Sequence, residues 1–363
     1  MKRLCFFALL MFFVTACTPS VSYRAVTPDT QLQFPRDHFA HDGFRTEWWY
    51  YTGHLEAEDG RTYGFELVFF SRRTEGDWRY CLPVWWFANP ANVAHFAISD
   101  LSEGKFVYGE SLGLRDPYRG GASENRYHLW SEDWQAVALD GVHYLSAAHD
   151  GYAIDLALTS RKPPALHGEN GYSFKGEGGS AASYYYSLTR LAVSGWLLKD
   201  GQRLRVTGGS AWMDHEVVSG AISPDIAGWD WFSLQLDDNT EIMFFLLRRP
   251  GGDAAPDSSG TFVFADGSTV HLKKDEVQVE ELAHWTSPRT HTRYPVAWRM
   301  RLPGRDLDLT LRAPLPHSEL LMSATDVNYW EGAVEIEGTR GSEKITGRGY
   351  VEMSGRDRPF QEI

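Results

Sequence analysis

Short turn signals between segments of alternating polarity constrain this chain more than any other feature. An Asp-Gly pair or a close relative between alternating runs is the strongest short-range signal of a β-hairpin. Helical periodicity is nearly absent, so we predict an antiparallel all-β fold with strands joined up and down. The turns lie at Glu58-Asp59-Gly60, Ser102-Glu103-Gly104, Lys199-Asp200-Gly201, Asp238-Asn239, Asp266-Gly267 and Arg340-Gly341.

Chain length and aromatic content indicate how these strands are arranged. The chain has 363 residues, 14 tryptophans and an aromatic share of 14%. So many large rings favour a barrel wide enough to hold a ligand, and so many strands exceed one small barrel. We therefore predict two barrel-like domains, residues 39–223 and 224–363, divided within the Gly- and Pro-bearing break at 219–228. Residues 248–260 are the alternative boundary, although they read more as an exposed loop.

The N-terminus has the features of an export signal. A positively charged start precedes an apolar run at residues 4–14, which is too short for a permanent transmembrane helix. The run ends in "VTAC", which is similar to a bacterial lipobox; an ordinary signal peptide with a chance cysteine is the alternative. We predict a signal at 1–17, an acylated Cys17 that anchors the chain to the membrane, and a polar tether at 18–38. The expected location is the outer membrane, facing the periplasm.

Charge and motifs argue against several classes of function. A net charge of −13 opposes binding to the phosphate backbone of nucleic acids. Apart from the signal and the acylated residue, Cys81 is the only cysteine, so no internal disulfide can form, and a small buried apolar role is favoured. No metalloprotease, serine-esterase or P-loop motif occurs, and the cluster Asp37, His38, His41 and Asp42 resembles a metal site only by composition. We therefore predict no metal.

Three adjacent ionisable residues, Asp214, His215 and Glu216, lie between apolar neighbours. In a strand, Asp214 and Glu216 share one face and His215 occupies the other. Repulsion between two carboxylates raises the pKa of one of them, which suits acid–base chemistry if that face lines a cleft. The alternative is a salt-bridged network at a domain junction, with Arg190 or Arg248 as the partner.

A second block, "EWWYYTGHL", joins a carboxylate to aromatic residues. Glu47 could supply a further catalytic carboxylate, and Trp48 and Trp49 could form walls of a pocket. The alternative is an aromatic core strand in which Glu47 is paired with an arginine. For His54 in the same block we favour the role of a hydrogen-bonded core histidine.

Five ordered blocks resemble the carotenoid 1,2-hydratase family, which overlaps a group called AttH-like predicted secreted hydrolases. The resemblance spans almost the whole chain beyond the signal and implies two lipocalin-like β-barrel domains. The blocks are "TEWWYYTGHL" (46–55), "YYYSLTRLAVSG" (184–195), "GSAWMDHE" (209–216), "GWDWFSLQLDDNTEIMFFLLR" (228–248) and residues 329–355.

The resemblance also implies a reaction, the addition of water to an isolated alkene without a cofactor. It maps the proton donor onto Asp214, which must then be protonated in a dry pocket. His215 or Glu216 would hold the water. Indole rings would stabilise the carbocation, and the candidates are Trp48, Trp49 and Trp212. Further expected substrate contacts in the shared blocks are Tyr185, Arg190 and Tyr329, with Arg190 favoured as a buried partner of Asp214 or Glu47.

Export changes the expected substrate, because the hydratases of the family act on pigments inside the cell. A lipoprotein of the envelope meets lipids and scavenged apolar molecules, so we expect a hydrophobic small molecule or lipid. A non-catalytic carrier of such a ligand, or an accessory protein of an envelope transporter, are the alternatives.

Overall fold

The computed structural model describes residues 23–359 apart from 76–77, 80–81, 84–88, 115–117, 176–181 and 221–222. Cys17 and Cys81 lie outside the described residues. Regular structure is almost entirely strand, and no helix in the described part is long and apolar enough to cross a bilayer. Within the described residues the helices are the 3-10 turns η1 (Arg36–His38), η3 (Lys274–Glu276) and η4 (Pro303–Arg305).

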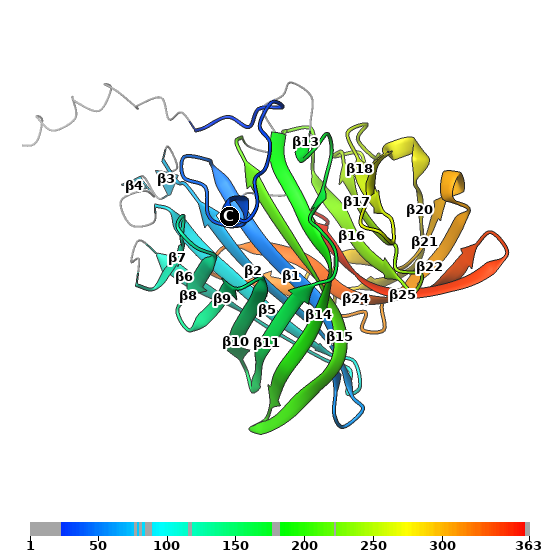
Figure 1. The fold of residues 1–363 in the computed structure, drawn as a ribbon, viewed down its shortest axis with the longest axis horizontal. Coiled ribbons are helices and arrows are strands. Elements are labelled where there is room, and N and C mark those ends of the chain that lie inside the picture. Colours follow the sequence, from blue (N-terminus) through cyan, green and yellow to red (C-terminus); the bar gives the residue numbers. More distant parts are fainter. Residues whose placement is uncertain are drawn as a thin grey trace, which may run out of the picture.

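The larger sheet curls into a nearly closed barrel (Figure 1). Its strand order is β6-β5-β2-β1-β15-β14-β11-β10-β9-β8-β7, with β12 and β13 also paired to β14. The two edges return to each other, since a Cβ added at Gly113 would lie 2.3 Å from Cα of Gly120. The strands are β1 (Thr46–Ala57), β2 (Thr62–Arg72), β5 (Ala91–Asp100), β6 (Lys105–Leu114), β7 (Gly120–Ala122), β8 (His128–Ser131), β9 (Trp134–Leu139), β10 (Val142–His149), β11 (Tyr152–Ser160), β12 (Ala165–Leu166), β13 (Tyr172–Phe174), β14 (Ala182–Lys199) and β15 (Gln202–Val218).

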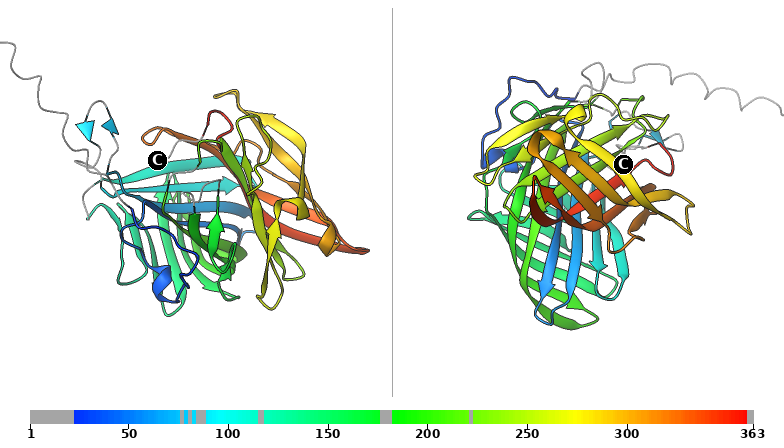
Figure 2. Two further views of the ribbon diagram at one scale, coloured as in Figure 1. Left: turned by 90° about the horizontal axis from the view of Figure 1, so that it is seen from above. Right: turned by 90° about the vertical axis from the view of Figure 1, so that its right-hand side faces the viewer.

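The second sheet forms a half-barrel that packs against the outside of the first (Figure 2). Its order is β19-β18-β17-β16-β25-β24-β22-β21-β20, with β23 paired to β24. A separate hairpin joins β3 (Trp78–Arg79) to β4 (Leu82–Pro83). The strands of the half-barrel are β16 (Gly228–Leu236), β17 (Glu241–Arg248), β18 (Ser259–Val263), β19 (Thr269–Lys273), β20 (Gln278–Thr286), β21 (Arg293–Leu302), β22 (Leu307–Arg312), β23 (Glu319–Met322), β24 (Val327–Arg340) and β25 (Glu343–Ser354).

Three separate apolar clusters explain this arrangement. One fills the large barrel, a second fills the half-barrel, and a third lies between the two sheets. Strand β1 contributes to two of them, because alternate side chains point to opposite faces of a sheet. Trp49 and Tyr51 point into the barrel, whereas Tyr50 packs in the interface with Trp48 against it. Because β1 is buried on both faces, its segment "EWWYY" does not alternate between apolar and polar residues.

The predicted all-β fold of two barrel-like domains is confirmed. Each of the predicted turns joins two antiparallel strands, from the β1–β2 hairpin to the β24–β25 hairpin. The expected tether differs in its described part, residues 23–38, which packs on the barrel. Val26 is buried beside Phe44 and Tyr184, and the Tyr184 hydroxyl donates to Thr30 Oγ1 at 2.6 Å. An apolar residue and a hydroxyl partner therefore hold a segment whose composition alone suggested a free linker.

Candidate functional site

A cavity of about 160 Å³ lies between the two sheets. Most of its wall is aromatic or aliphatic, and both sheets contribute. The larger sheet supplies β1, β2, β5, β14 and β15, and the half-barrel supplies β16, β17, β24 and β25. Its apolar wall includes Trp48, Tyr50, Phe70, Trp229, Trp231, Phe245 and Leu247.

Asp214 on β15 lines this cavity and is 3% exposed. Trp212 Nε1 donates to its Oδ1 at 2.6 Å, and the hydroxyls of Tyr185 and Ser187 also bond to its carboxyl group. Tyr185 in turn accepts a hydrogen bond from Trp231 Nε1 at 2.9 Å, so the half-barrel helps to orient this group. Burial raises the pKa of Asp214 to about 7, although the three hydrogen bonds oppose the shift. Close to neutral pH this carboxyl can therefore carry a proton.

Glu352 on β25 is a second carboxyl group in the cavity wall. Burial raises its pKa to about 7, against the effect of a 2.8 Å hydrogen bond from Trp229 Nε1. The charge of Asp214 contributes to this shift, which shows that the two groups interact across the cavity. Two interacting carboxyl groups that titrate near neutrality can exchange the roles of proton donor and acceptor.

Glu216 shares the cavity face with Asp214 but has a different environment. It forms an ion pair with Lys175, whose Nζ lies 4.9 Å from the ring centre of Tyr185 and 5.2 Å from that of Phe245. The lysine therefore neutralises Glu216 and places a cation beside aromatic rings of the wall. Glu216 therefore has a cationic partner, while Asp214 is left without one in the described structure.

A separate polar group lies farther along the cavity. The Tyr329 hydroxyl donates to Glu66 Oε1 at 2.8 Å and contacts His95 Nδ1 at 2.9 Å. All three residues line the cavity and are at most 6% exposed. Burial lowers the pKa of His95 to about 3, so its imidazole is neutral, and burial raises the pKa of Glu66 to about 8.

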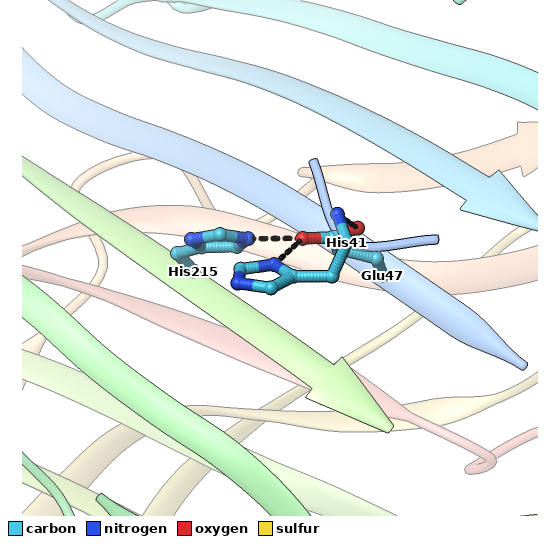
Figure 3. Close-up of side chains that lie close together, drawn as sticks. All are labelled: His41, Glu47 and His215. Carbon is cyan, nitrogen blue, oxygen red and sulfur yellow. Dashed lines mark hydrogen bonds and ion pairs between the residues drawn. The ribbon is translucent and has the colours of Figure 1, made fainter. Parts of the chain in front are cut away.

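The large barrel holds a different cluster, shown in Figure 3. Glu47 Oε1 lies 2.7 Å from both His41 Nδ1 and His215 Nε2. The outer nitrogen of His41 reaches Asp37 at 3.0 Å, and Trp49 stacks on the His215 ring at 4.7 Å between centres. Burial acts to lower the pKa of His41, but its bonds to Glu47 and Asp37 outweigh it and raise that pKa.

This cluster has a donor set that could hold a divalent cation. One donor atom from each of His41, Glu47 and His215 lies within 4.8 Å of the others, and two imidazoles with a carboxylate suit Zn²⁺. The same atoms are also satisfied without an ion, because a protonated His41 donates to both Asp37 and Glu47. The neighbours of His41 in the chain gave no sign of this contact with Glu47 and His215, because the three residues meet only in the folded barrel.

The structure thus divides the expected site residues between two places. Five of them line the cavity: Asp214, Glu216, Trp48, Tyr185 and Tyr329. Trp212 does not line it but donates a hydrogen bond to Asp214. A different group faces the barrel interior, on the opposite side of the same strands, and does not reach the cavity: Glu47, Trp49 and His215.

The expected partners of the arginines need correction. Arg190 does not pair with Asp214 or Glu47 and does not line the cavity. Its Nε binds Glu241 Oε1 at 2.5 Å, and its Nη2 donates to Leu236 O at 2.9 Å. Arg248 pairs with Asp230 at 3.0 Å rather than with the block around Asp214. The actual pairs could not be predicted, because the sequence does not show which strands meet across the interface.

Sequence reasoning missed several groups at the cavity: Glu66, His95, Lys175, Ser187 and Glu352. The signal for Glu352 was present, because it alternates with Tyr350 in a quoted block of the last strand. His54 has the expected core role, since its Nε2 lies 3.0 Å from Gly349 O.

Comparison with known proteins agrees with the fold and identifies the family. The family model described as AttH-like matches residues 25–356. The chain belongs to the AttH-like family. A search of curated proteins found no match. Among solved structures, the AttH protein NE1406 of Nitrosomonas europaea has a TM-score of 0.82 and 32% identity, covering 92% of this chain and 99% of that chain.

Two further solved structures share the fold of this AttH-like chain at lower identity. Kievitone hydratase from Nectria haematococca has a TM-score of 0.69 and 15% identity, covering 93% of this chain and 97% of its own. CghA has a TM-score of 0.54 and 14% identity, with 88% and 89% covered. At these identities the likeness concerns the fold.

Proposed function

We propose that the protein is a cofactor-free hydratase, or the corresponding lyase, which acts on an alkene of a hydrophobic substrate in the cavity between the sheets. The observation that carries this proposal is Asp214, a buried carboxyl group with a pKa near 7 in an aromatic cavity. The hydratase activity in the name of kievitone hydratase, which shares the fold, supports the same class of reaction.

The proposed reaction divides the work between two carboxyl groups. Protonated Asp214 gives its proton to one alkene carbon, and the π electrons form the new C–H bond. The cation left on the other carbon faces indole rings of the wall, such as Trp48 and Trp231, which attract positive charge. Water then bonds to that carbon and releases a proton to ionised Glu352. The reverse sequence removes water, so the direction depends on the substrate supplied.

Proton transfer of this kind requires the polar groups to be held in place. Tyr185 and Ser187 fix the carboxyl of Asp214, and His167 Nε2 fixes Ser187 Oγ at 2.5 Å. The apolar wall limits water near the cation, which suits a reaction that must admit one water molecule at a defined position.

We also propose that the mature protein is anchored to the envelope through an acylated Cys17 and takes its ligand from the lipid phase. The support is the lipobox-like sequence and the apolar character of the cavity. Incorporation of labelled palmitate into the wild type, but not into Cys17→Ser, tests the anchor. A water-soluble wild-type protein without label would contradict it.

The test of the reaction uses citronellol, an acyclic alcohol with a trisubstituted alkene, in heavy water. Hydration through Asp214 places deuterium on carbon, which mass spectrometry detects in the product. We expect Asp214→Asn to lower the rate at least about 100-fold, because general acid catalysis contributes about 10²–10⁴. Asp155→Asn, an exposed aspartate on β11, is the matched control and should leave the rate unchanged.

Two outcomes separate the enzyme from the alternatives. Deuterium incorporation that persists in Asp214→Asn would remove Asp214 as the proton donor. Binding of apolar alcohols with no product in the wild type or either variant would favour a carrier of hydrophobic ligands.

A further inference from the structure

The cavity has a second polar end whose hydrogen-bonding capacity is unused. Among the described residues, His95 Nε2 and Glu66 Oε2 are buried atoms without a hydrogen-bond partner. Both residues line the cavity, and both are held by the hydroxyl of Tyr329. A buried polar atom without a partner is costly because it has lost its hydrogen bonds to water, so two at one place indicate a ligand that satisfies them.

The hydrogen-bond directions define what the two atoms can do. Tyr329 uses its proton to donate to Glu66 Oε1, so it must accept at His95 and Nδ1 carries the imidazole hydrogen. Neutral His95 then presents a bare lone pair at Nε2. Burial raises the pKa of Glu66, so its other oxygen, Oε2, carries a proton near neutrality and is a donor. This end of the cavity therefore offers one acceptor and one donor.

A hydroxyl group is the ligand group that matches this pair, because it donates and accepts at the same oxygen. A hydrocarbon would leave both atoms unsatisfied. A carboxylate would accept from Glu66 but has no hydrogen to donate to His95 Nε2, and its charge would be costly to bury in this cavity. A ketone would leave His95 Nε2 without a donor.

The strand register places this polar end away from the proposed reaction centre. Asp214, Tyr50, Val68 and His95 are direct partners across β15, β1, β2 and β5, so they lie in one row on one face of the sheet. Three strand spacings separate Asp214 from His95 by about 14 Å. Contacts of about 3 Å at each end leave about 8 Å between the hydroxyl oxygen and the protonated carbon. Tyr50 stands between the two ends in this row, and the rings of Phe70 and Trp231 are also part of the cavity wall.

We propose that Glu66, His95 and Tyr329 form a hydroxyl-binding subsite, and that the ligand is an elongated apolar molecule with a hydroxyl group at the end remote from its alkene. Nothing in the proposed reaction uses these residues. The inference rests on the proposed function only for the position of the alkene, because the hydroxyl subsite is a property of binding.

The test compares three probes of one skeleton: citronellol, citronellic acid and the dimethyloctene that lacks the oxygen. Isothermal titration calorimetry on the wild-type protein should give an affinity for the alcohol about 30-fold above that for the hydrocarbon, since the two net hydrogen bonds are worth about 1 kcal/mol each. The acid should bind more weakly than the alcohol at pH 7.

His95→Phe keeps a ring and removes the acceptor, so only the bond from Glu66 should remain and the preference for the alcohol should fall to about fivefold. Its effect on the hydrocarbon should stay within about twofold. Glu66→Gln keeps a donor and should retain most of the preference for the alcohol. His143→Phe, a buried histidine of the large barrel that does not line the cavity, is the matched control and should retain the preference in full.

The inference is overturned if the wild type binds no probe, binds alcohol and hydrocarbon equally, or binds the acid best. It is also overturned if His95→Phe and His143→Phe weaken all probes to the same extent, because that result would indicate a structural role. A hydroxyl preference without deuterium incorporation would contradict the proposed reaction alone. Incorporation without a hydroxyl preference would contradict the subsite alone.

Discussion

At the scale of single residues, the surroundings of a buried carboxyl group decide what it can do. Asp214 and Glu47 are both buried, and their strands are direct neighbours in the sheet. Burial acts to raise the pKa of Glu47, but hydrogen bonds from His215 and His41 outweigh it and lower that pKa. The partners of Asp214 are neutral hydroxyls and an indole, so burial prevails there. Glu47 is therefore an ionised partner of histidines, whereas Asp214 can hold a proton near neutral pH.

The raised pKa of Asp214 makes a prediction about stability. Its pKa is about 7 in the folded protein and near the ordinary aspartate value of 3.8 in the unfolded chain. Between these values the folded state holds a proton that the unfolded state lacks, so this contribution is complete below pH 4 and is lost as pH rises to 7. From pH 5 to pH 8 the loss is about 2.5 kcal/mol, because the slope of about 1.4 kcal/mol per unit flattens once the pH passes the folded pKa.

Asp214→Asn removes this titration and should gain stability relative to the wild type as pH rises. Urea unfolding of both proteins at pH 5 and pH 8 measures the change in their difference, which cancels the other titrating groups. Asp155→Asn, at an exposed position, is the control for the loss of one aspartate carboxyl group. If the difference in unfolding free energy between Asp214→Asn and the wild type is the same at both pH values, Asp214 titrates near its ordinary value. It would then hold no proton near neutral pH.

At the scale of strands, the sequence predicts pairing much better than it predicts the site. Asp-Gly turns define hairpins because they connect neighbours in the chain, and the predicted hairpins are present. Alternation also places Asp214 and Glu216 on the cavity face and His215 on the other. The cavity itself forms from strands far apart in the chain, so nothing local to Glu66, His95 or Glu352 shows that they face Asp214.

The contact between β2 and the half-barrel gives a prediction at this scale. A Cβ added at Gly64 would lie 2.2 Å from the Tyr350 hydroxyl and 3.2 Å from Ala333 Cβ. Gly64→Ala should therefore destabilise the protein by about 1–3 kcal/mol, as overpacking of a buried interface does. In the Tyr350→Phe background the closest contact is absent, and the cost should fall by at least half.

Urea unfolding of the four proteins of this double-mutant cycle measures the coupling between Gly64 and Tyr350. Gly304→Ala is the control, because an added Cβ there meets nothing within 4 Å, and it should change stability by less than about 0.5 kcal/mol. Equal costs of Gly64→Ala in both backgrounds would show that the two sheets do not approach each other at this point.

At the scale of the whole molecule, the cavity exists only while the two sheets keep their relative position. Besides the apolar interface, a buried ion cluster joins them. Lys162, which follows β11, donates to Glu241 Oε2 on β17 at 2.7 Å, and Arg190 on β14 binds the other oxygen. Lys162 also donates to two backbone carbonyls of the half-barrel, Asn239 O at 2.6 Å and Phe264 O at 2.8 Å. The sequence could not reveal this cluster, since its members are separated in the chain and resemble surface charges.

Neutralising Glu241 should therefore weaken the molecule and its cavity together. Glu241→Gln leaves Lys162 buried without its carboxylate, which should cost about 3–5 kcal/mol in urea unfolding. The double variant Glu241→Leu with Lys162→Met replaces the pair by apolar groups and should recover most of that stability. Citronellol affinity then separates the two roles of the cluster. If the cluster sets the position of the sheets, the double variant folds stably but binds the alcohol more weakly; unchanged affinity would mean that the apolar interface alone holds the cavity in shape.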